Sequence, residues 1–434
     1  MSTSSASPHS GPPDSAHYLR AVTQLSERCG VVTQAAIYAD NGIKLVEKGA
    51  RIDGRLYERL VQHKLREPID HLLSTDATVD TAALVAAALA LTDSQPLPRL
   101  LVQALGSPDR LVEPLRSVPL PSPIAFKLTV MREQRPALLE HSLQVVLVAV
   151  FLGLQTGMDS EACVPLAAAA LLHDVGVLHM DPQWQDPQHK ITGAGRKHLV
   201  VHPITAMLVV RGAQAYCTAV EMAVLEHHER MDSTGYPRGL SGEAISPLGR
   251  ILLLAEVVAA FYEKYADWPA QQLSLMLRLN HRKFPPALTA HVLVLLQAHT
   301  PQQVAALAPL GTDAPRHIAA LAQAFAHWDR IRQQHPEQPL APDQPLGFVD
   351  LRLRALQKTL LEAGAHPSQQ AQMLEPLQGD AAGMAELAFL GREALWQMQA
   401  IANACQRRWP TSAQPNQGVD TAVAAWCDAV LRPA

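Results

Sequence analysis

Apolar residues recur at helical spacing through the middle of the chain, which predicts one helix after another from about residue 124 to 298. Glycine and proline lie close together in 182–195 and 232–247, so both stretches are predicted to be loops, the first of them polar and lying over a site. The segments predicted as helices are 138–154, 163–172, 198–211, 217–229, 248–265 and 286–296. This pattern predicts a central bundle built from helices alone.

The first 118 residues show a different pattern, which predicts a small α+β region. Residues 1–15 are rich in serine, proline and glycine and are predicted to form a disordered tail. The residues on both sides of Asn41-Gly42 predict a β-hairpin over about 33–48 that closes with a type I′ turn and is the main β element of the chain. Helices are predicted over 16–29, 56–72, 81–91 and 98–105.

Proline-rich segments mark the predicted joints between domains, because proline cannot continue a helix. The run 118–123 (Val-Pro-Leu-Pro-Ser-Pro) marks one such joint. The apolar helix faces near the C-terminus, for example around Phe325 and Trp328, fit a helical core better than a dimer or partner surface, although both readings stay open. The C-terminal helices are predicted near 315–335, 347–363, 382–405 and 420–431. We therefore predict a mainly α protein with an N-terminal regulatory domain (1–118), a central all-helical bundle (119–299) and a C-terminal helical extension (300–434).

Composition and charge narrow the class of protein. Of the 434 residues, 48% are hydrophobic and only 5% are aromatic, which suits helices better than sheets. A net charge of −4 gives no electrostatic footprint for nucleic acid. The five cysteines are scattered without a CxxC pair, which predicts a reducing compartment. Without an apolar N-terminal segment, and with apolar runs such as 145–154 too short for a bilayer, the sequence predicts a cytoplasmic protein without a membrane span.

Side chains that commonly bind metals gather in three short islands between residues 171 and 250, and a helical segment upstream adds one more histidine. A neutral imidazole offers one nitrogen, whereas a carboxylate has two oxygens and can bridge two ions roughly 3.5–4 Å apart. Histidine-rich ligation with few thiols suits Fe, Mn, Zn, Co or Ni rather than Ca or Mg. In chain order the candidates are His141, His173, Asp174, His202, His227 and His228.

Two ions held in this way would polarise a phosphodiester and lower the pKa of an attacking water. Metal-assisted phosphodiester hydrolysis therefore follows if these residues converge. Each candidate also has an ordinary explanation: His141 alone fits a packed or surface histidine, and the His173-Asp174 pair fits a hydrogen bond at a helix end. His227-His228 fits an exposed helix end, where cationic side chains complement the dipole. Because all these explanations would have to hold at once, we favour metal binding.

The order of these residues resembles the HD-GYP family, a branch of the HD phosphohydrolases. The resemblance extends to 237–240, Ile245, 250–256 and 284–288, and more weakly to the hairpin segment 40–49. The motifs that carry it are His141, His173-Asp174, His202, His227-His228-Glu229 and Gly235-Tyr236-Pro237, all in register. Because an HD pair alone is weak evidence, the combination is what makes the resemblance specific.

The resemblance implies an all-helical domain that hydrolyses the bacterial second messenger cyclic di-GMP to linear pGpG or on to GMP. It implies two divalent ions, Fe or Mn ahead of Zn, Co or Ni, with His173 and Asp174 as catalytic residues. It assigns one ion to His141, His173, Asp174 and Glu256, the second ion to Asp174, His202, His227 and His228, and the substrate pocket to Gly235, Tyr236, Pro237, Arg238 and Lys264. It also implies contacts between the Gly-Tyr-Pro loop and diguanylate cyclase (GGDEF) domains. A homodimer is a further possible assembly.

Several positions depart from the family pattern. Val177 stands where the family has a lysine that can contact phosphate, and Glu256 replaces an aspartate, although we expect it still to ligate. Ala137 replaces the glutamate of members with three metals, so we predict two ions. Ser233 replaces a usual glycine, and in the substrate-contact stretch 263–267 only Lys264 could replace the family's arginines.

Three functions are compatible with these observations. The retained metal ligands favour an active cyclic di-GMP phosphodiesterase. The loss of the lysine at Val177 and the changed stretch 263–267 favour a catalytically weak protein that acts as a nucleotide sensor or a protein-interaction module. A phosphohydrolase with another nucleotide substrate is the third, and the Gly-Tyr-Pro loop argues against it.

Overall fold

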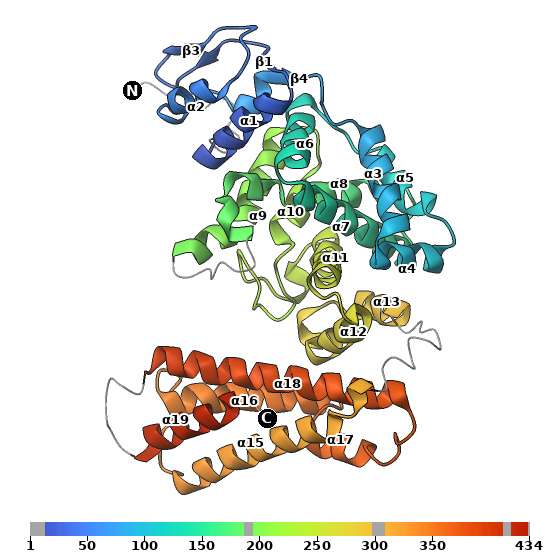
Figure 1. Ribbon diagram of the computed structural model, residues 1–434, viewed down its shortest axis with the longest axis vertical. Helices are drawn as coiled ribbons and strands as arrows, with labels where there is room; N and C mark the ends of the chain where they lie inside the picture. Colours follow the sequence, from blue (N-terminus) through green and yellow to red (C-terminus); the bar gives the residue numbers. More distant parts are fainter. Residues whose placement is uncertain (1–13, 186–193, 297–308, 411–417, 433–434) are drawn as a thin grey trace. The chain divides into compact units, whose positions relative to one another are not determined.

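The computed structural model describes residues 14–185, 194–296, 309–410 and 418–432, and it is mainly helical, as predicted (Figure 1). The chain forms two compact units. The first takes in residues up to 266 together with 282–295, and the second takes in 267–281 together with the chain from 296 onward. The limits of the three predicted domains stay predictions, and most of the predicted N-terminal tail lies outside the described residues.

The first unit is built from helices, with the N-terminal strands gathered near α1 (Figure 1). Short 3-10 turns connect several helices. The helices are α1 (Ala16–Arg28), α2 (Gly54–Val61), α3 (Thr81–Ser94), α4 (Pro96–Leu105), α5 (Asp109–Arg116), α6 (Ser122–Gln134), α7 (Pro136–Gln155), α8 (Val164–Leu172), α9 (Ala194–Gly212), α10 (Thr218–Glu226), α11 (Pro247–Lys264) and α13 (Pro286–Leu296). The 3-10 turns are η1 (Ile69–His71), η2 (Val175–His179), η3 (Pro182–Gln185), η4 (Gly242–Ala244) and η5 (His281–Lys283). The predicted loop over 182–195 falls largely outside the described residues.

The predicted hairpin is present, but its turn differs from the prediction. Strand β2 (Ile37–Tyr38) pairs antiparallel with β3 (Lys44–Val46). A type I′ turn needs positive φ at two residues, whereas only Gly42 has one, at 84°. The Ala39 N–H donates to the Ile43 carbonyl at 2.8 Å, so three residues close the hairpin with Gly42 in the left-handed position. The predicted type I′ turn is therefore wrong.

The helix predicted over 56–72 is also wrong in its extent, because α2 ends at Val61. The chain beyond it bonds to the hairpin: the Asp40 N–H donates to the Lys64 carbonyl at 2.8 Å, and the Arg66 N–H donates to the Tyr38 carbonyl at 3.0 Å. These tertiary bonds override the local helical spacing. The segment then forms β4 (Leu73–Thr75), which pairs antiparallel with β1 (Val31–Thr33), a pairing that the sequence did not indicate.

Helix α7 is the central helix of the first unit and packs against α8 and α11. Its apolar residues are buried on all sides, among them Leu143, Val146 and Phe151. With 20 residues and a mean hydropathy of 1.9, α7 alone among the described helices is long and apolar enough to cross a membrane. However, 83% of its apolar window is buried inside the protein, as expected of a core helix.

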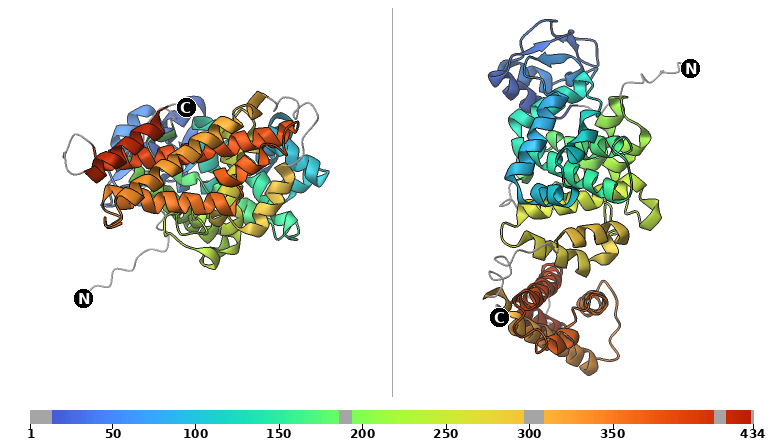
Figure 2. Two further views of the ribbon diagram at one scale, coloured as in Figure 1. Left: turned by 90° about the horizontal axis from the view of Figure 1, so that it is seen from below. Right: turned by 90° about the vertical axis from the view of Figure 1, so that its right-hand side faces the viewer.

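The second unit holds long helices that lie side by side (Figure 2). Phe325 and Trp328 are buried in its apolar core, which supports the core reading of that helix face. Trp328 Nε1–H donates to the buried carboxylate of Asp350 at 3.1 Å, so the polar edge of the indole is satisfied within the core. The helices are α12 (Pro269–Leu279), α15 (Ala314–Gln334), α16 (Pro345–Glu362), α17 (Pro367–Met373), α18 (Ala381–Arg408) and α19 (Gly418–Leu431).

Candidate metal centre

The predicted metal ligands come from five helices of the first unit and converge on one site. Helices α8 and α10 both end there, since His173 is the C-cap of α8 and His227 is the C-cap of α10. Asp174 and His228 follow directly after these caps. The other candidates lie within helices: His141 in α7, His202 in α9 and Glu256 in α11.

A close backbone approach brings α9 to the His173-Asp174 segment. A Cβ added at Gly176 would lie 2.2 Å from the carbonyl oxygen of His202 and 2.8 Å from the backbone nitrogen of Ala206, so no larger residue fits there. As a result, His202 Nε2 lies 3.3 Å from Asp174 Oδ1. The glycine two residues after the HD pair thus has a packing role that places the next ligand.

Three of the histidines are oriented by the same hydrogen bond. Nδ1 of His173, His202 and His227 lies 2.5–2.7 Å from the backbone carbonyl oxygen three residues earlier in the chain. A carbonyl oxygen can only accept, so Nδ1 carries the proton in each ring and Nε2 keeps its lone pair. Metal-binding histidines are commonly fixed in this way.

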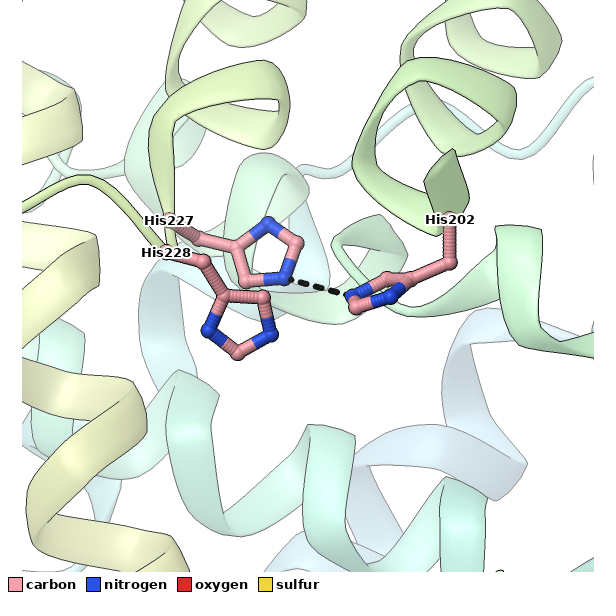
Figure 3. A group of neighbouring side chains, drawn as sticks. All are labelled: His202, His227 and His228. Atoms are coloured by element: carbon pink, nitrogen blue, oxygen red, sulfur yellow. Dashed lines mark hydrogen bonds between the residues drawn. The ribbon is translucent and has the colours of Figure 1, made fainter. Parts of the chain in front are cut away.

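The lone pairs of His202 and His227 face each other across the site, with His228 beside them (Figure 3). The two Nε2 atoms are 3.1 Å apart, and the rings of His227 and His228 are 4.1 Å apart between centroids. Ligand atoms of all three rings lie within 4.8 Å of one another. This group is therefore compact enough to hold one cation.

Asp174 lies between this group and a second one. Its Oδ1 is 3.3 Å from His202 Nε2 and 3.7 Å from His227 Nε2, whereas its Oδ2 is 3.6 Å from His173 Nε2. His141, His173 and Asp174 offer ligand atoms that also lie within 4.8 Å of one another. One carboxylate oxygen thus faces each group, which is the arrangement of a bridging ligand.

His141 lies between two carboxylates of α11. Its Nε2 is 2.9 Å from Glu256 Oε2, and its Nδ1 is 2.9 Å from Glu263 Oε1. Glu256 Oε2 is also 3.3 Å from His173 Nε2. Glu263 therefore does for His141 what a backbone carbonyl does for the other rings, and the sequence analysis did not identify this role. Its spacing of seven residues from Glu256, two turns along one helix face, was the available signal.

The electrostatics of Asp174, His227 and His228 favour the protonation states that metals require, whereas the carboxylates near His141 and His173 raise the pKa of both rings and favour a proton that a metal ion would replace. Burial alone would raise the pKa of Asp174, but three neighbouring histidines outweigh it and hold that pKa well below its usual value. Burial lowers the pKa of His227 far below its usual value and that of His228 to about 3. For His141, Glu256 and Glu263 outweigh the effect of burial and raise the pKa well above its usual value.

The residues present fit a metal pair because they offer more electron pairs than protons. Among the described residues, the buried atoms His173 Nε2 and Asp174 Oδ1 have no hydrogen-bond partner. The lone pairs of His202 and His227 likewise face each other without a proton between them. Buried acceptors without partners are costly. Divalent cations at these positions would satisfy all of them.

Glu229 fixes the loop that follows the histidine pair. Its carboxylate is fully buried and accepts hydrogen bonds from the backbone N–H groups of Arg238, at 2.7 Å, and Leu240, at 2.9 Å. A Cβ added at Gly235 would lie 2.3 Å from the backbone nitrogen of Arg230, so the loop packs tightly against the segment that carries the histidines. Glu229 therefore positions the Gly-Tyr-Pro loop.

The Gly-Tyr-Pro loop lies beside the group formed by His202, His227 and His228. The Tyr236 N–H donates to the carbonyl of His228 at 3.1 Å, and the two rings lie 4.7 Å apart. Pro237 follows through a cis peptide bond. The loop thus contacts a predicted metal ligand directly, which agrees with its predicted place in the pocket wall.

The cationic side chains near the loop differ in their partners. Arg238 Nη2 donates to the buried carboxylate of Glu226, and Lys264 Nζ lies 5.0 Å from the ring centre of Tyr265. Both were predicted to bind substrate. Arg230, which was not predicted, donates from Nη1 to the Glu229 carbonyl at 2.8 Å. It lies in sequence between the histidine pair and the Gly-Tyr-Pro loop.

Two departures from the family pattern have structural explanations. Ser233 has a φ of 66°, in the left-handed region that favours glycine, which accounts for the usual glycine at this position. Val177 is only 8% exposed and packs in the core directly after the HD turn. A charged side chain at 177 would have to extend out of this packed position to reach a substrate.

Comparison with known proteins shows which family this region resembles. Residues 129–288 match the family described as the HD domain. The chain is 31% identical over 120 residues to 3′3′-cGAMP-specific phosphodiesterase 3 of Vibrio cholerae, covering 28% of this chain and 26% of that protein. It is 33% identical over 107 residues to the cyclic di-GMP phosphodiesterase response regulator RpfG of Xanthomonas campestris pv. campestris, covering 24% and 28%. Residues 129–288 form an HD domain of the HD-GYP type.

The HD-GYP domain has further relatives of the same kind. Cyclic di-GMP phosphodiesterase PdeB of Borreliella burgdorferi is 28% identical over 120 residues, which cover 28% of this chain and 31% of that protein. The chain thus spans between about a quarter and a third of the length of these curated relatives. Bd1817, an HDG"Y"P protein of Bdellovibrio bacteriovorus, superposes with a TM-score of 0.35 and 15% identity over 62% of this chain and 95% of its own, which is too loose to carry an argument. Divalent metals are bound by this family, and the two His/Asp groups are suited to them.

Proposed function

We propose that the chain is a metal-dependent phosphodiesterase that hydrolyses cyclic di-GMP to pGpG and GMP in bacterial second-messenger signalling. The observation that carries this proposal is the position of Asp174, whose two oxygens lie 3.3 Å from His202 Nε2 and 3.6 Å from His173 Nε2. Two divalent ions, Fe or Mn ahead of Zn, Co or Ni, would be held on either side of it. The relatives named as cyclic di-GMP phosphodiesterases support the choice of substrate.

When bound, the two cations would polarise a phosphoryl group and lower the pKa of the attacking water. The chain's own part is to keep its ligands in the required state. Asp174 stays ionised among the histidines, and the imidazoles present Nε2 lone pairs because their Nδ1 protons are held by carbonyls. Tyr236 would form a wall beside the reacting phosphate, and its contact with His228 keeps that wall next to the metal ligands.

A second candidate is a catalytically weak HD-GYP protein that senses a nucleotide or binds a protein partner. Val177 supports it, because a buried apolar side chain stands where a lysine could reach phosphate. Lys264 supports it as well, since its ammonium group lies over the ring of Tyr265. A different cyclic dinucleotide is a further possibility to include in the assay, because two relatives are named 3′3′-cGAMP-specific phosphodiesterases.

The deciding experiment is a hydrolysis assay with the purified chain. The protein, loaded with Mn or anaerobically with Fe(II), is mixed with cyclic di-GMP or 3′3′-cGAMP, and the linear products and GMP are resolved by chromatography. The proposal expects pGpG and GMP from the wild type and none from Asp174→Ala. A surface variant, Glu161→Ala, serves as the matched control and should keep full activity. Nucleotide binding without product would favour the second candidate.

We also propose two assemblies, the first of them implied by the resemblance. The Gly-Tyr-Pro loop would contact GGDEF domains, and the side chain of Arg238 within it is 38% exposed while it pairs with Glu226. The chain would also form a homodimer. Pull-down with purified GGDEF domains, compared between wild type and Arg238→Glu, tests the first assembly. Analytical ultracentrifugation of the whole chain tests the second.

A further inference from the structure

The predicted substrate-binding cations leave a phosphate group without a dedicated partner. Val177 cannot supply a charge, and Arg238 is bonded to the buried carboxylate of Glu226. Lys264 is exposed and lies over the ring of Tyr265. A dianionic cyclic dinucleotide nevertheless needs positive charge besides the metal ions if it is to be held in one orientation. Another cation near the metal centre would have to supply this charge.

Arg230 is placed to meet this need. It lies two residues after His228, on the segment against which Gly235 packs, and it is only partly exposed. Its Nη1 donates to the Glu229 carbonyl at 2.8 Å, and its guanidinium carbon lies 5.7 Å from the ring centre of Phe284. These two contacts brace the guanidinium in one orientation.

Among the residues that the structure describes, the remaining donors of Arg230, Nε and Nη2, have no hydrogen-bond partner. Neither atom is among the fully buried polar atoms that lack a partner, so both remain accessible. A guanidinium presents its N–H groups as a planar fork that matches two oxygens of a phosphate. The braced side chain therefore offers such a fork to a ligand.

The charge of Arg230 interacts with residues of the metal centre and of the Gly-Tyr-Pro loop. Burial lowers the pKa of the guanidinium, while Glu256 and Tyr236 act in the opposite direction. Arg230 also contributes to lowering the pKa of His228. These effects agree with the position of Arg230, two residues after His228 and in backbone contact with Gly235 of the Gly-Tyr-Pro loop.

We propose that Arg230 binds phosphoryl oxygens of the nucleotide through Nε and Nη2 and supplies the cationic contact that Val177 cannot provide. This inference rests on the proposed phosphodiesterase function. Arg230 makes the contact from the segment that carries His228 and leads into the Gly-Tyr-Pro loop. Substrate affinity then depends on Arg230, whereas metal binding does not.

The test compares Arg230→Gln and Arg230→Lys with the wild type and with a surface control, Arg211→Gln. Four quantities are measured for each Mn-loaded protein: the metal content by elemental mass spectrometry, KM and kcat with cyclic di-GMP, and the dissociation constant of pGpG by calorimetry. Charge-assisted hydrogen bonds of this kind predict that Arg230→Gln raises KM and the pGpG dissociation constant roughly 10- to 100-fold. Arg230→Lys keeps the charge but loses the fork, so we expect an intermediate increase. Metal content should be unchanged in both.

The outcomes separate this inference from the function on which it rests. A wild type that neither binds pGpG nor hydrolyses cyclic di-GMP overturns both. An active wild type with an Arg230→Gln variant of unchanged KM and unchanged pGpG affinity overturns the role of Arg230 alone. If Arg230→Gln does not fold, Arg230→Lys decides: an increase of severalfold in KM at normal metal content supports the role, and wild-type values contradict it.

Discussion

His141 Nδ1 lies 2.9 Å from Glu263 Oε1, although 122 positions separate the two residues in sequence. The contact holds the Nδ1 proton of the ring and turns Nε2 toward Glu256, 2.9 Å away. The other anchored histidines obtain the same orientation from a backbone carbonyl of their own helix. The first metal group therefore depends on a side chain from another helix.

Removing the Glu263 carboxylate should weaken metal binding by the group that contains His141. We expect Glu263→Ala to lower the affinity for one of the two Mn ions about 10- to 100-fold, since partners of ligating histidines typically contribute that much. Glu263→Gln is the matched control, because its amide oxygen can still accept a hydrogen bond from His141 Nδ1. Its Mn affinity should therefore decrease less than that of Glu263→Ala. Calorimetric titration of the metal-free protein with Mn gives the affinities of the two metal sites. Equal affinities in Glu263→Ala and wild type would show that Glu263 does not orient His141.

Glu229 should be important for stability as well as for the shape of the pocket. In Glu229→Ala the backbone N–H groups of Arg238 and Leu240 lose their acceptors in a buried place. Because hydrogen bonds to a charged group are involved, the free energy of unfolding should fall by roughly 3 kcal/mol. Glu229→Gln keeps one acceptor oxygen, so its free energy of unfolding should lie between those of the wild type and Glu229→Ala. Urea denaturation measures these differences, and an Ala variant as stable as the wild type would contradict the assigned role.

The sequence predicted the site better than it predicted the N-terminal region. The metal ligands stand at fixed positions relative to helix ends, so the spacing of His173-Asp174 and His227-His228 already carried most of the geometry. Glu263 and Arg230 act through contacts with distant segments; the spacing of Glu263 from Glu256 places both on one helix face but does not show which distant residue they contact. For the same reason the helix expected over 56–72 was too long: residues 64–66 bond to a hairpin that precedes them in the chain.

Stability should depend on pH through Asp14. Burial and the nearby Asp70 raise its pKa to about 7, against the attraction of Lys127. A carboxyl group with a raised folded-state pKa stabilises the fold at low pH, and this contribution is lost as pH rises from about 4 to about 7. The melting temperature of Asp14→Asn should therefore increase relative to that of the wild type as pH rises through this window.

The Asp14 comparison needs a control for general charge effects. Glu58→Gln removes a carboxylate from the exposed side of α2 and should follow the wild-type pH profile. Melting temperatures from pH 4 to 8 are measured for all three proteins. Parallel curves for Asp14→Asn and wild type across this range would contradict the assignment.

Val177→Lys restores the family's residue at a position that is now buried. If the ammonium group extends to the pocket, KM for cyclic di-GMP should fall severalfold, while stability decreases because buried methyl groups are lost. Val177→Met is the control, since it changes the shape without adding charge. Steady-state kinetics decide the question, and an unchanged KM in a folded lysine variant would show that the missing lysine does not limit this protein.

The most direct test of the account is to locate the metal ions themselves. Crystals of the chain grown with Mn should show two anomalous-scattering peaks, one on each side of the Asp174 carboxylate. The first should lie among His141, His173 and Glu256, and the second among His202, His227 and His228. A map without peaks at Asp174, or with both ions bound elsewhere, would contradict the proposed metal centre and the hydrolase function built on it.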